Sequence, residues 1–123
     1  MHSPDAFAAA WRDAWNSHDL DAILAHFTDD LVFTSPAIRR IVGGDGVVRG
    51  KDALRACWSA GLERIPDLHF EIEGVYVGIT TMVINYRNQR GNLVCEVLHF
   101  DGALVREGHG TYLDATNPEG ATT

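Results

Sequence analysis

Two glutamates and a histidine near the end of the chain have the residue types and spacing for proton transfer. Glu96 precedes the dipeptide Asp101-Gly102, and Glu107 and His109 follow it. An Asp-Gly pair between two strand-like segments predicts a two-residue hairpin turn. Counting back from that turn places Glu96 directly opposite Glu107, with His109 on the same face. Two opposed carboxylates in a poorly hydrated site cannot both ionise cheaply, so a nearby imidazole could hold the proton between them.

The surroundings of this cluster decide between two interpretations. Leu98 and Phe100 share the face of Glu96, so an apolar setting and acid–base chemistry are indicated. In the alternative interpretation Glu96 pairs with Arg87 or Arg106, and the histidine only forms a hydrogen bond within a half-buried sheet. A turn one residue longer would shift the direct opposition, although the three side chains could still share a face.

Length and composition indicate a single domain spanning residues 1–123, with an ordered core over about 4–114 and a polar tail over 115–123. The formal net charge is −7 and Lys51 is the only lysine, which disfavours nucleic acid and anionic membranes as partners. Cys57 and Cys95 form no C-x-x-C pair and lie in apolar segments, which is typical of a reducing cytoplasm. No signal peptide and no membrane-spanning segment are predicted.

The first third of the chain carries helix signals. Ser3 as N-cap and Pro4 at the first helical position predict a helix that begins at Pro4. Asp19 is the expected cap of a short second helix, and "LVFTSP" over residues 31–36 follows as a strand that ends at its proline.

A glycine-rich connection is predicted over residues 37–50, followed by a third, amphipathic helix that closes before Pro66. Gly50-Lys51 before that helix suggests a phosphate-binding loop, but Asp45 and Asp52 stand where the pattern needs a glycine and a hydroxyl. The connection is therefore interpreted as structural. Its arginines, Arg39 and Arg40, are expected to be solvated or, in the alternative, to lie at the mouth of a pocket.

The hydrophobic period changes after the third helix. Segments rich in β-branched and aromatic residues predict four antiparallel strands over residues 68–78, 79–88, 92–101 and 103–114. Three helices followed by such a sheet indicate the α+β class, with the helices on one face of a strongly curved, mainly antiparallel sheet.

The order of these elements resembles the nuclear transport factor two-like superfamily, in its SnoaL-like and ketosteroid isomerase-like branch. Four motifs carry the resemblance: "WN-x-x-DLD-x-I-x-x-x-F-x-x-D", "F-x-SP", "G-x-x-AL-x-x-x-W" and "HFDG-x-L". The resemblance implies a cone-shaped roll with an apolar cavity lined by Phe27 and Phe33. It also implies a homodimer through the outer sheet face, where Cys95, Val97, Gly108 and Gly110 would supply small contact groups.

The functional positions of the isomerase transfer only in part. The resemblance places its phenolic donor on Trp11, its general-base aspartate on Ser35 and its protonated oxyanion-hole acid on Glu96. Because the base is missing, ordinary ketosteroid isomerisation is not expected.

Several apolar or hydroxyl-bearing residues are expected to contact a ligand in the cavity. They are Trp11, Trp15, Phe27, Phe33, Ser35, Trp58, Ile84, Tyr86 and Leu98. The tryptophans could equally be core residues, and the sequence leaves open which face of their strand Met82, Ile84 and Tyr86 occupy.

The resulting hypothesis is a protein that binds a small, largely apolar molecule, such as a polyketide-like or steroid-like compound. Glu96, Glu107 and His109 would handle protons in an isomerase, cyclase or hydrolase reaction. The alternative is a non-catalytic module that binds a small ligand or a protein partner. No cofactor is expected, and no metal site, because His18 and His26 have no partner at a known ligand spacing.

Overall fold

The computed structural model describes residues 3–113, so the tail expected over 115–123 lies outside the described residues. This part of the chain forms four helices and six strands. They are α1 (Pro4–Asn16), α2 (Leu20–Leu24), β1 (Phe27–Thr34), α3 (Pro36–Val42), β2 (Val47–Arg49), α4 (Lys51–Arg64), β3 (Glu71–Val77), β4 (Thr81–Arg87), β5 (Leu93–Asp101) and β6 (Leu104–Tyr112). The predicted α+β class is confirmed.

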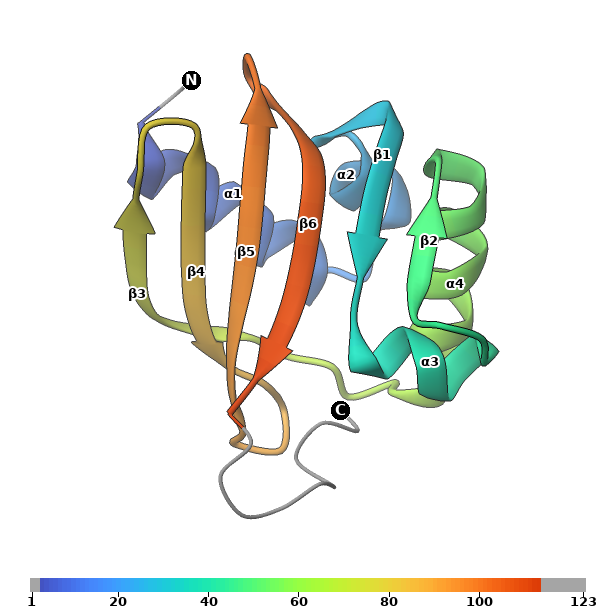
Figure 1. Ribbon diagram of the computed structural model, residues 1–123. Helices are drawn as coiled ribbons and strands as arrows, with labels where there is room; N and C mark the ends of the chain where they lie inside the picture. Colours follow the sequence, from blue (N-terminus) through green and yellow to red (C-terminus); the bar gives the residue numbers. More distant parts are fainter. Residues whose placement is uncertain (1–2, 114–123) are drawn as a thin grey trace.

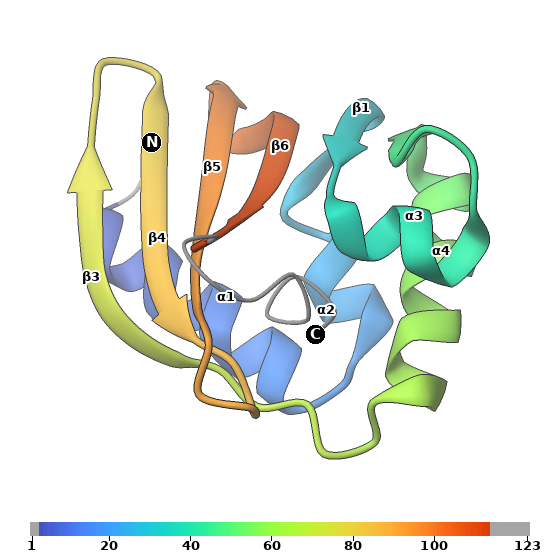
Figure 2. The same cartoon turned by 60° about the horizontal axis from the view of Figure 1, so that its bottom comes forward.

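The six strands form one sheet in the order β2-β1-β6-β5-β4-β3 (Figure 1). All neighbours pair antiparallel except β1 and β6, which run parallel. Because β1 lies early in the chain and β6 late, the first and last strands meet in the middle of the sheet. The sheet curls so that α1 and α2 lie against its inner face, with α3 and α4 on the side of β1 (Figure 2).

Three of the helices begin close to the predicted places, but α2 ends at Leu24 and β1 already begins at Phe27, a residue expected in the second helix. The α1 helix begins at Pro4, although the Ser3 side chain forms no capping hydrogen bond. Asp19 caps α2 by accepting a hydrogen bond from the backbone N–H of Ala22. None of the helices in the described part of the chain is both long and apolar enough to cross a membrane.

The segment predicted as a glycine-rich connection is more ordered than expected. It contains a further helix, α3, and a short strand, β2. The Ser35 hydroxyl accepts a hydrogen bond from the backbone N–H of Ala37, and Pro36 occupies the first helical position, so the Ser-Pro pair starts a helix as well as ending a strand. The glycines of the following loop adopt positive φ, and the chain returns so that β2 pairs with β1.

The β5–β6 hairpin departs from the predicted register in two ways. Asp101 pairs with Leu104, so the turn residues are Gly102 and Ala103, and the left-handed φ of 64° falls on Gly102. A β-bulge then interrupts the ladder, because Phe100 pairs with Val105 but His99 pairs with Glu107. The extra residue on β6 reverses which face each later side chain of that strand occupies.

Aromatic side chains fill the space between the sheet and the helices. Trp15 meets Trp58 at a centroid distance of 4.8 Å, and Trp58 meets Phe33 at 5.2 Å, both edge to face. On the other side of the core Phe70 lies 4.3 Å from Tyr86. These contacts join α1, α4 and the sheet into one core, and that core forms the walls of the site described next.

Candidate functional site

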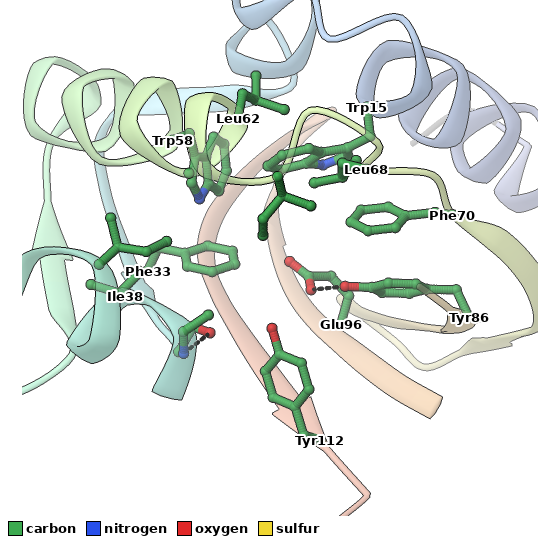
Figure 3. Close-up of a pocket in the computed structure, with 15 residues that line it drawn as sticks. Trp15, Phe33, Ile38, Trp58, Leu62, Leu68, Phe70, Tyr86, Glu96 and Tyr112 are labelled. Atoms are coloured by element: carbon green, nitrogen blue, oxygen red, sulfur yellow. Dashed lines mark hydrogen bonds between the residues drawn. The ribbon is translucent and has the colours of Figure 1, made fainter. Parts of the chain in front are cut away.

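A cavity of about 80 Å³ lies between the inner face of the sheet and the helices α3 and α4 (Figure 3). Most of its wall is apolar and includes Phe33, Ile38, Trp58, Leu62, Leu68 and Phe70. Polar groups enter the wall from the strand side, where Ser35, Tyr86, Glu96 and Tyr112 lie. An apolar cavity with a few convergent polar groups is the usual form of a small-molecule site.

Glu96 is the ionisable carboxyl group of the cavity lining. It stands on β5 between Ile84 of β4 and Gly110 of β6, and only 5% of it is exposed. The Tyr86 hydroxyl donates a hydrogen bond of 3.3 Å to Glu96 Oε1. Burial disfavours the charged form and raises the pKa of Glu96 to about 7, while the hydrogen bond from Tyr86 acts in the opposite direction. Glu96 can therefore donate or accept a proton near neutral pH.

Tyr86 is fixed as a hydrogen-bond donor. It is buried against Phe70 and Trp11, and burial, followed by the charge of Glu96, raises its pKa well above the ordinary value of 10. The phenol therefore keeps its proton when Glu96 is ionised. Among the described residues Glu96 forms no ion pair with Arg87 or Arg106, the partners expected in the alternative interpretation. Arg87 contacts Glu73 and the backbone carbonyl of Gly91 instead.

Gly110 makes room between Glu96 and Ser35. A Cβ at this position would lie 3.1 Å from Ser35 Oγ and 3.6 Å from Glu96 Oε1. A side chain here would fill the gap between the two polar groups. The Ser35 hydroxyl already accepts a hydrogen bond from Ala37 N–H at 3.1 Å, which leaves its own proton free to be donated.

Trp15 brings a further donor to the cavity wall. Its indole Nε1–H is buried and has no acceptor among the described residues. Leaving a buried N–H unpaired costs about 1–3 kcal/mol. A ligand with an acceptor atom within reach would recover that free energy.

Only some of the residues that were expected to contact a ligand line the cavity. Trp15, Phe33, Ser35, Trp58, Tyr86 and Glu96 line the cavity. Trp11, Phe27, Ile84 and Leu98 do not, because they are buried in the core. Trp11 stacks on Phe70 and lies 5.2 Å from Tyr86, so it supports lining residues from behind.

The expected opposition of Glu96 and Glu107 is wrong. Glu96 pairs with Gly110, whereas Glu107 pairs with His99 and His109 pairs with Val97. The β-bulge places Glu107 and His109 on the outer face of the sheet, away from the cavity. Gly108 and Gly110, expected on the outer face, point inward, since added Cβ atoms would meet Phe33 and Ser35.

On the outer face Glu107 and His109 form a hydrogen-bonded pair. His109 Nε2 lies 2.6 Å from Glu107 Oε2, and His109 Nδ1 lies 2.6 Å from the hydroxyl of Thr34 on β1. The hydrogen bond from His109 lowers the pKa of Glu107, against the smaller opposing effect of desolvation. The expected alternative, a histidine hydrogen-bonded within a half-buried sheet, thus describes His109.

Comparison with known proteins identifies the family of the fold. A family model described as a SnoaL-like domain matches residues 8–109. The chain belongs to the SnoaL-like family. A search of curated proteins found no match. A SnoaL-like protein of unknown function from Burkholderia thailandensis is 42% identical, with a TM-score of 0.83, over 89% of this chain and 93% of that one.

Two more distant structures show the same fold as this SnoaL-like domain. TerC, co-crystallised with polyporic acid, is 13% identical with a TM-score of 0.75 and covers 89% of this chain and 92% of its own. An NTF2-like protein of unknown function from Burkholderia pseudomallei is 15% identical with a TM-score of 0.72 over 91% and 92% of the two chains. The expected place in the NTF2-like superfamily is confirmed.

Sequence reasoning missed several residues that line the cavity of this SnoaL-like domain. Ile38 and Ile41 come from α3, and Leu68 and Phe70 come from the segment that leads into β3. The Ser-Pro pair that starts α3 was a usable signal. Tyr112 was also missed, because its face on β6 depends on a bulge that no local pattern announces.

Proposed function

We propose that the cavity binds a small, largely apolar molecule and presents Glu96 to a polar group of that molecule. The observation that carries this proposal is a buried carboxyl group at the wall of a largely apolar cavity, where burial raises its pKa to about 7. The Ser35 hydroxyl and the Trp15 N–H are the donors that would orient a carbonyl or enol oxygen. A mostly apolar cavity with a few polar groups favours an apolar ligand that carries a hydrogen-bonding group at one end.

The volume of the cavity limits the size of the ligand. A cavity of about 150 Å³ holds benzene, and this one measures about 80 Å³. A ring-sized ligand therefore needs the lining to widen. Ile41, Leu62 and Ile65 are only partly buried, so the side formed by α3 and the end of α4 is the place where this would occur.

Acid–base catalysis on such a ligand would rest on Glu96 alone among the carboxyl groups of the lining. The ionised form takes a proton from carbon beside a carbonyl group and becomes the neutral acid. The neutral acid then returns the proton to another atom of the same molecule, either a carbon or a newly formed alkoxide. The proton balance closes, so isomerisation and aldol-type cyclisation are the reactions that one carboxyl group can complete.

A non-catalytic binding module is the second candidate. It is favoured by the role of Ser35, whose hydroxyl caps α3 at the position where the resembling isomerase carries its base.

The free cysteines, Cys57 and Cys95, support the further proposal of a reducing, cytoplasmic location.

Deuterium exchange separates the two candidates. The protein is incubated in D₂O with small aromatic and alicyclic ketones, and exchange at the carbon beside the carbonyl is followed by NMR. The co-crystallisation of TerC with polyporic acid supports aromatic compounds as the first probes. An acid–base enzyme accelerates the exchange, and Glu96→Gln lowers it about 100-fold to 10,000-fold.

Glu63→Gln on the exposed surface of α4 is the matched control and should exchange like the wild type. Ligand-induced stabilisation without exchange would favour the binding module. If none of the compounds raises the melting temperature or exchanges, the proposed cavity function is contradicted.

A further inference from the structure

Three side chains on the outer face of the sheet gather atoms that bind metals. His99, Glu107 and His109 each offer one ligand atom, and these atoms all lie within 4.8 Å of one another. Glu107 and His109 are two residues apart on β6 and therefore share a face. His99 of β5 stands directly opposite Glu107, because the β-bulge sets this register. The backbone of two strands thus brings the three groups together.

One nitrogen of each imidazole lies near a hydroxyl group on a neighbouring strand. Thr34 Oγ1 on β1 lies 2.6 Å from His109 Nδ1, and Thr81 Oγ1 on β4 lies 3.5 Å from His99 Nδ1. Metal-binding histidines almost always use their other nitrogen in this way, which fixes the direction of the ring. The His109 ring is accordingly turned so that Nε2 faces Glu107.

In the short contact between His109 and Glu107, a proton lies where a metal ion could bind. His109 Nε2 and Glu107 Oε2 are 2.6 Å apart and share one proton. If that proton leaves, Nε2 offers its lone pair, and Nδ1 can carry the hydrogen and donate it to Thr34. A threonine hydroxyl serves both arrangements, because it can donate or accept a hydrogen bond.

We propose that His99, Glu107 and His109 bind one Zn²⁺ ion on the outer face of the sheet, with water completing a tetrahedral site. Two histidines and a glutamate are one of the ligand sets of zinc sites with an open position. Zinc bonds of about 2.0–2.1 Å place tetrahedral ligand atoms about 3.3–3.4 Å apart. The present separations lie on both sides of that value, between 2.6 Å and 4.8 Å.

The side chains have the freedom to reach this geometry. The exposed fraction is 29% for the side chain of His109 and 42% for that of Glu107, so rotation about side-chain bonds is unobstructed on the solvent side. In the single chain the same exposure gives the ion a path from solvent and room for a water ligand. The site is separate from the cavity, because Glu96 lies on the opposite face of the same strand as His99.

This proposal departs from the expectation of no metal site. That expectation rested on local spacings, which detect ligands within one helix or one loop. Here the pattern is Glu-x-His on β6 together with a histidine from the facing strand. The pairing register that joins them depends on the bulge.

Titration of untagged protein with Zn²⁺ and with Co²⁺ tests the proposal. Calorimetry should show one Zn²⁺ per chain, and Co²⁺ should give the strong visible absorption of a tetrahedral site. His99→Gln, Glu107→Gln and His109→Gln should each weaken binding by at least about tenfold. His69→Gln, which changes an exposed histidine elsewhere, should bind as the wild type does.

Thr34→Val provides a variant that keeps all three ligands. Loss of the partner of His109 Nδ1 should weaken Zn²⁺ binding by about 10–100-fold without removing it. Circular dichroism of every variant checks that the fold is intact. The proposal would be overturned if the folded wild type bound no metal at millimolar concentration, or if binding survived His109→Gln. The cluster would then only hold neighbouring strands together by hydrogen bonds.

Discussion

Glu96 and Gly110 face each other across the β5–β6 ladder, and a Cβ on residue 110 would lie 3.6 Å from Glu96 Oε1. The same Cβ would lie 3.1 Å from Ser35 Oγ. The missing side chain at this position therefore keeps the carboxyl group of Glu96 accessible from the cavity.

Gly110→Ala should reduce ligand binding more than it reduces stability. Its φ lies outside the left-handed region, so alanine fits the backbone, but the added methyl group occupies space beside Glu96. We expect a loss of about 1 kcal/mol in the free energy of unfolding and loss of ligand-induced stabilisation in thermal melts. Gly74→Ala, whose Cβ would meet Tyr76 at 3.6 Å, is the control and should change neither. Unchanged ligand binding by Gly110→Ala would place the ligand elsewhere.

Gly108→Ala should be strongly destabilising. The added Cβ would lie 2.8 Å from two ring carbons of Phe33, which is itself wedged against Trp58 and Phe27. Overpacking of this kind costs about 1–3 kcal/mol. Urea unfolding of Gly108→Ala beside Gly74→Ala measures the difference, and equal midpoints would contradict the packing described for β6.

The stability of the wild type should fall as pH rises through neutrality because of Glu96. Its pKa is about 7 in the folded protein and 4.5 in an unfolded chain, so the folded state binds more protons between these values. The contribution of Glu96 to the free energy of unfolding is fully present below pH 4.5 and is lost as pH rises through 7. Its size is at most about 3 kcal/mol.

Urea unfolding at a series of pH values compares the wild type with Glu96→Gln, which has no titrating group at this position. The difference in unfolding free energy between the two proteins should change across that range. The Glu63→Gln control should run parallel to the wild type. If the wild-type and Glu96→Gln profiles are also parallel, the elevated pKa of Glu96 is refuted.

Trp15→Phe and Trp11→Phe form a matched pair, because both indole N–H groups are buried without an acceptor among the described residues. Removing an unsatisfied donor offsets part of the packing loss, so each variant should lose less than about 2 kcal/mol. Only Trp15 of the two lines the cavity, so only Trp15→Phe should lower the affinity for a ligand with an acceptor atom. If isothermal titrations gave the two variants equal affinity for such a ligand, Trp15 would not be a ligand-binding residue.

Homodimerisation through the outer sheet face stays a prediction. Val97 lies near the middle of that face, between Val83 of β4 and His109 of β6, and is half-buried in the single chain. Light scattering should show a dimer at high micromolar concentration, and Val97→Arg should give a folded monomer, because charge at the centre of an interface is unfavourable. A monomeric wild type would refute the prediction.

The elements with local signals were predictable from the sequence. Asp19 caps its helix, α1 begins at Pro4, and α4 follows its amphipathic period. The β5–β6 register was not predictable in this way, because the turn falls one residue later than the Asp-Gly pair suggests and a bulge adds a further residue. The turn shift alone would leave Glu107 and His109 on the face of Glu96, so the bulge decides their face, and it is not encoded within a single strand.

For the site, Glu96 was chosen from a resemblance and from a hairpin register that set it opposite Glu107 on an apolar face. That register is wrong, but the structure places Glu96 in the cavity lining. The cavity itself depends on α3. The Ser-Pro pair that starts this helix was interpreted as the end of a strand, because proline is compatible with both roles.

The parallel pairing of β1 with β6 has a consequence for how the cavity comes into existence during synthesis. Ser35 follows directly on β1 and Glu96 lies on β5, and the two are joined through the ladder that β6 forms with both strands. Contacts between segments so far apart in sequence form late and slowly in folding. On the ribosome, the residues that would handle a ligand therefore stay apart until β6 has emerged, and nascent chains that stop short of it hold no pocket.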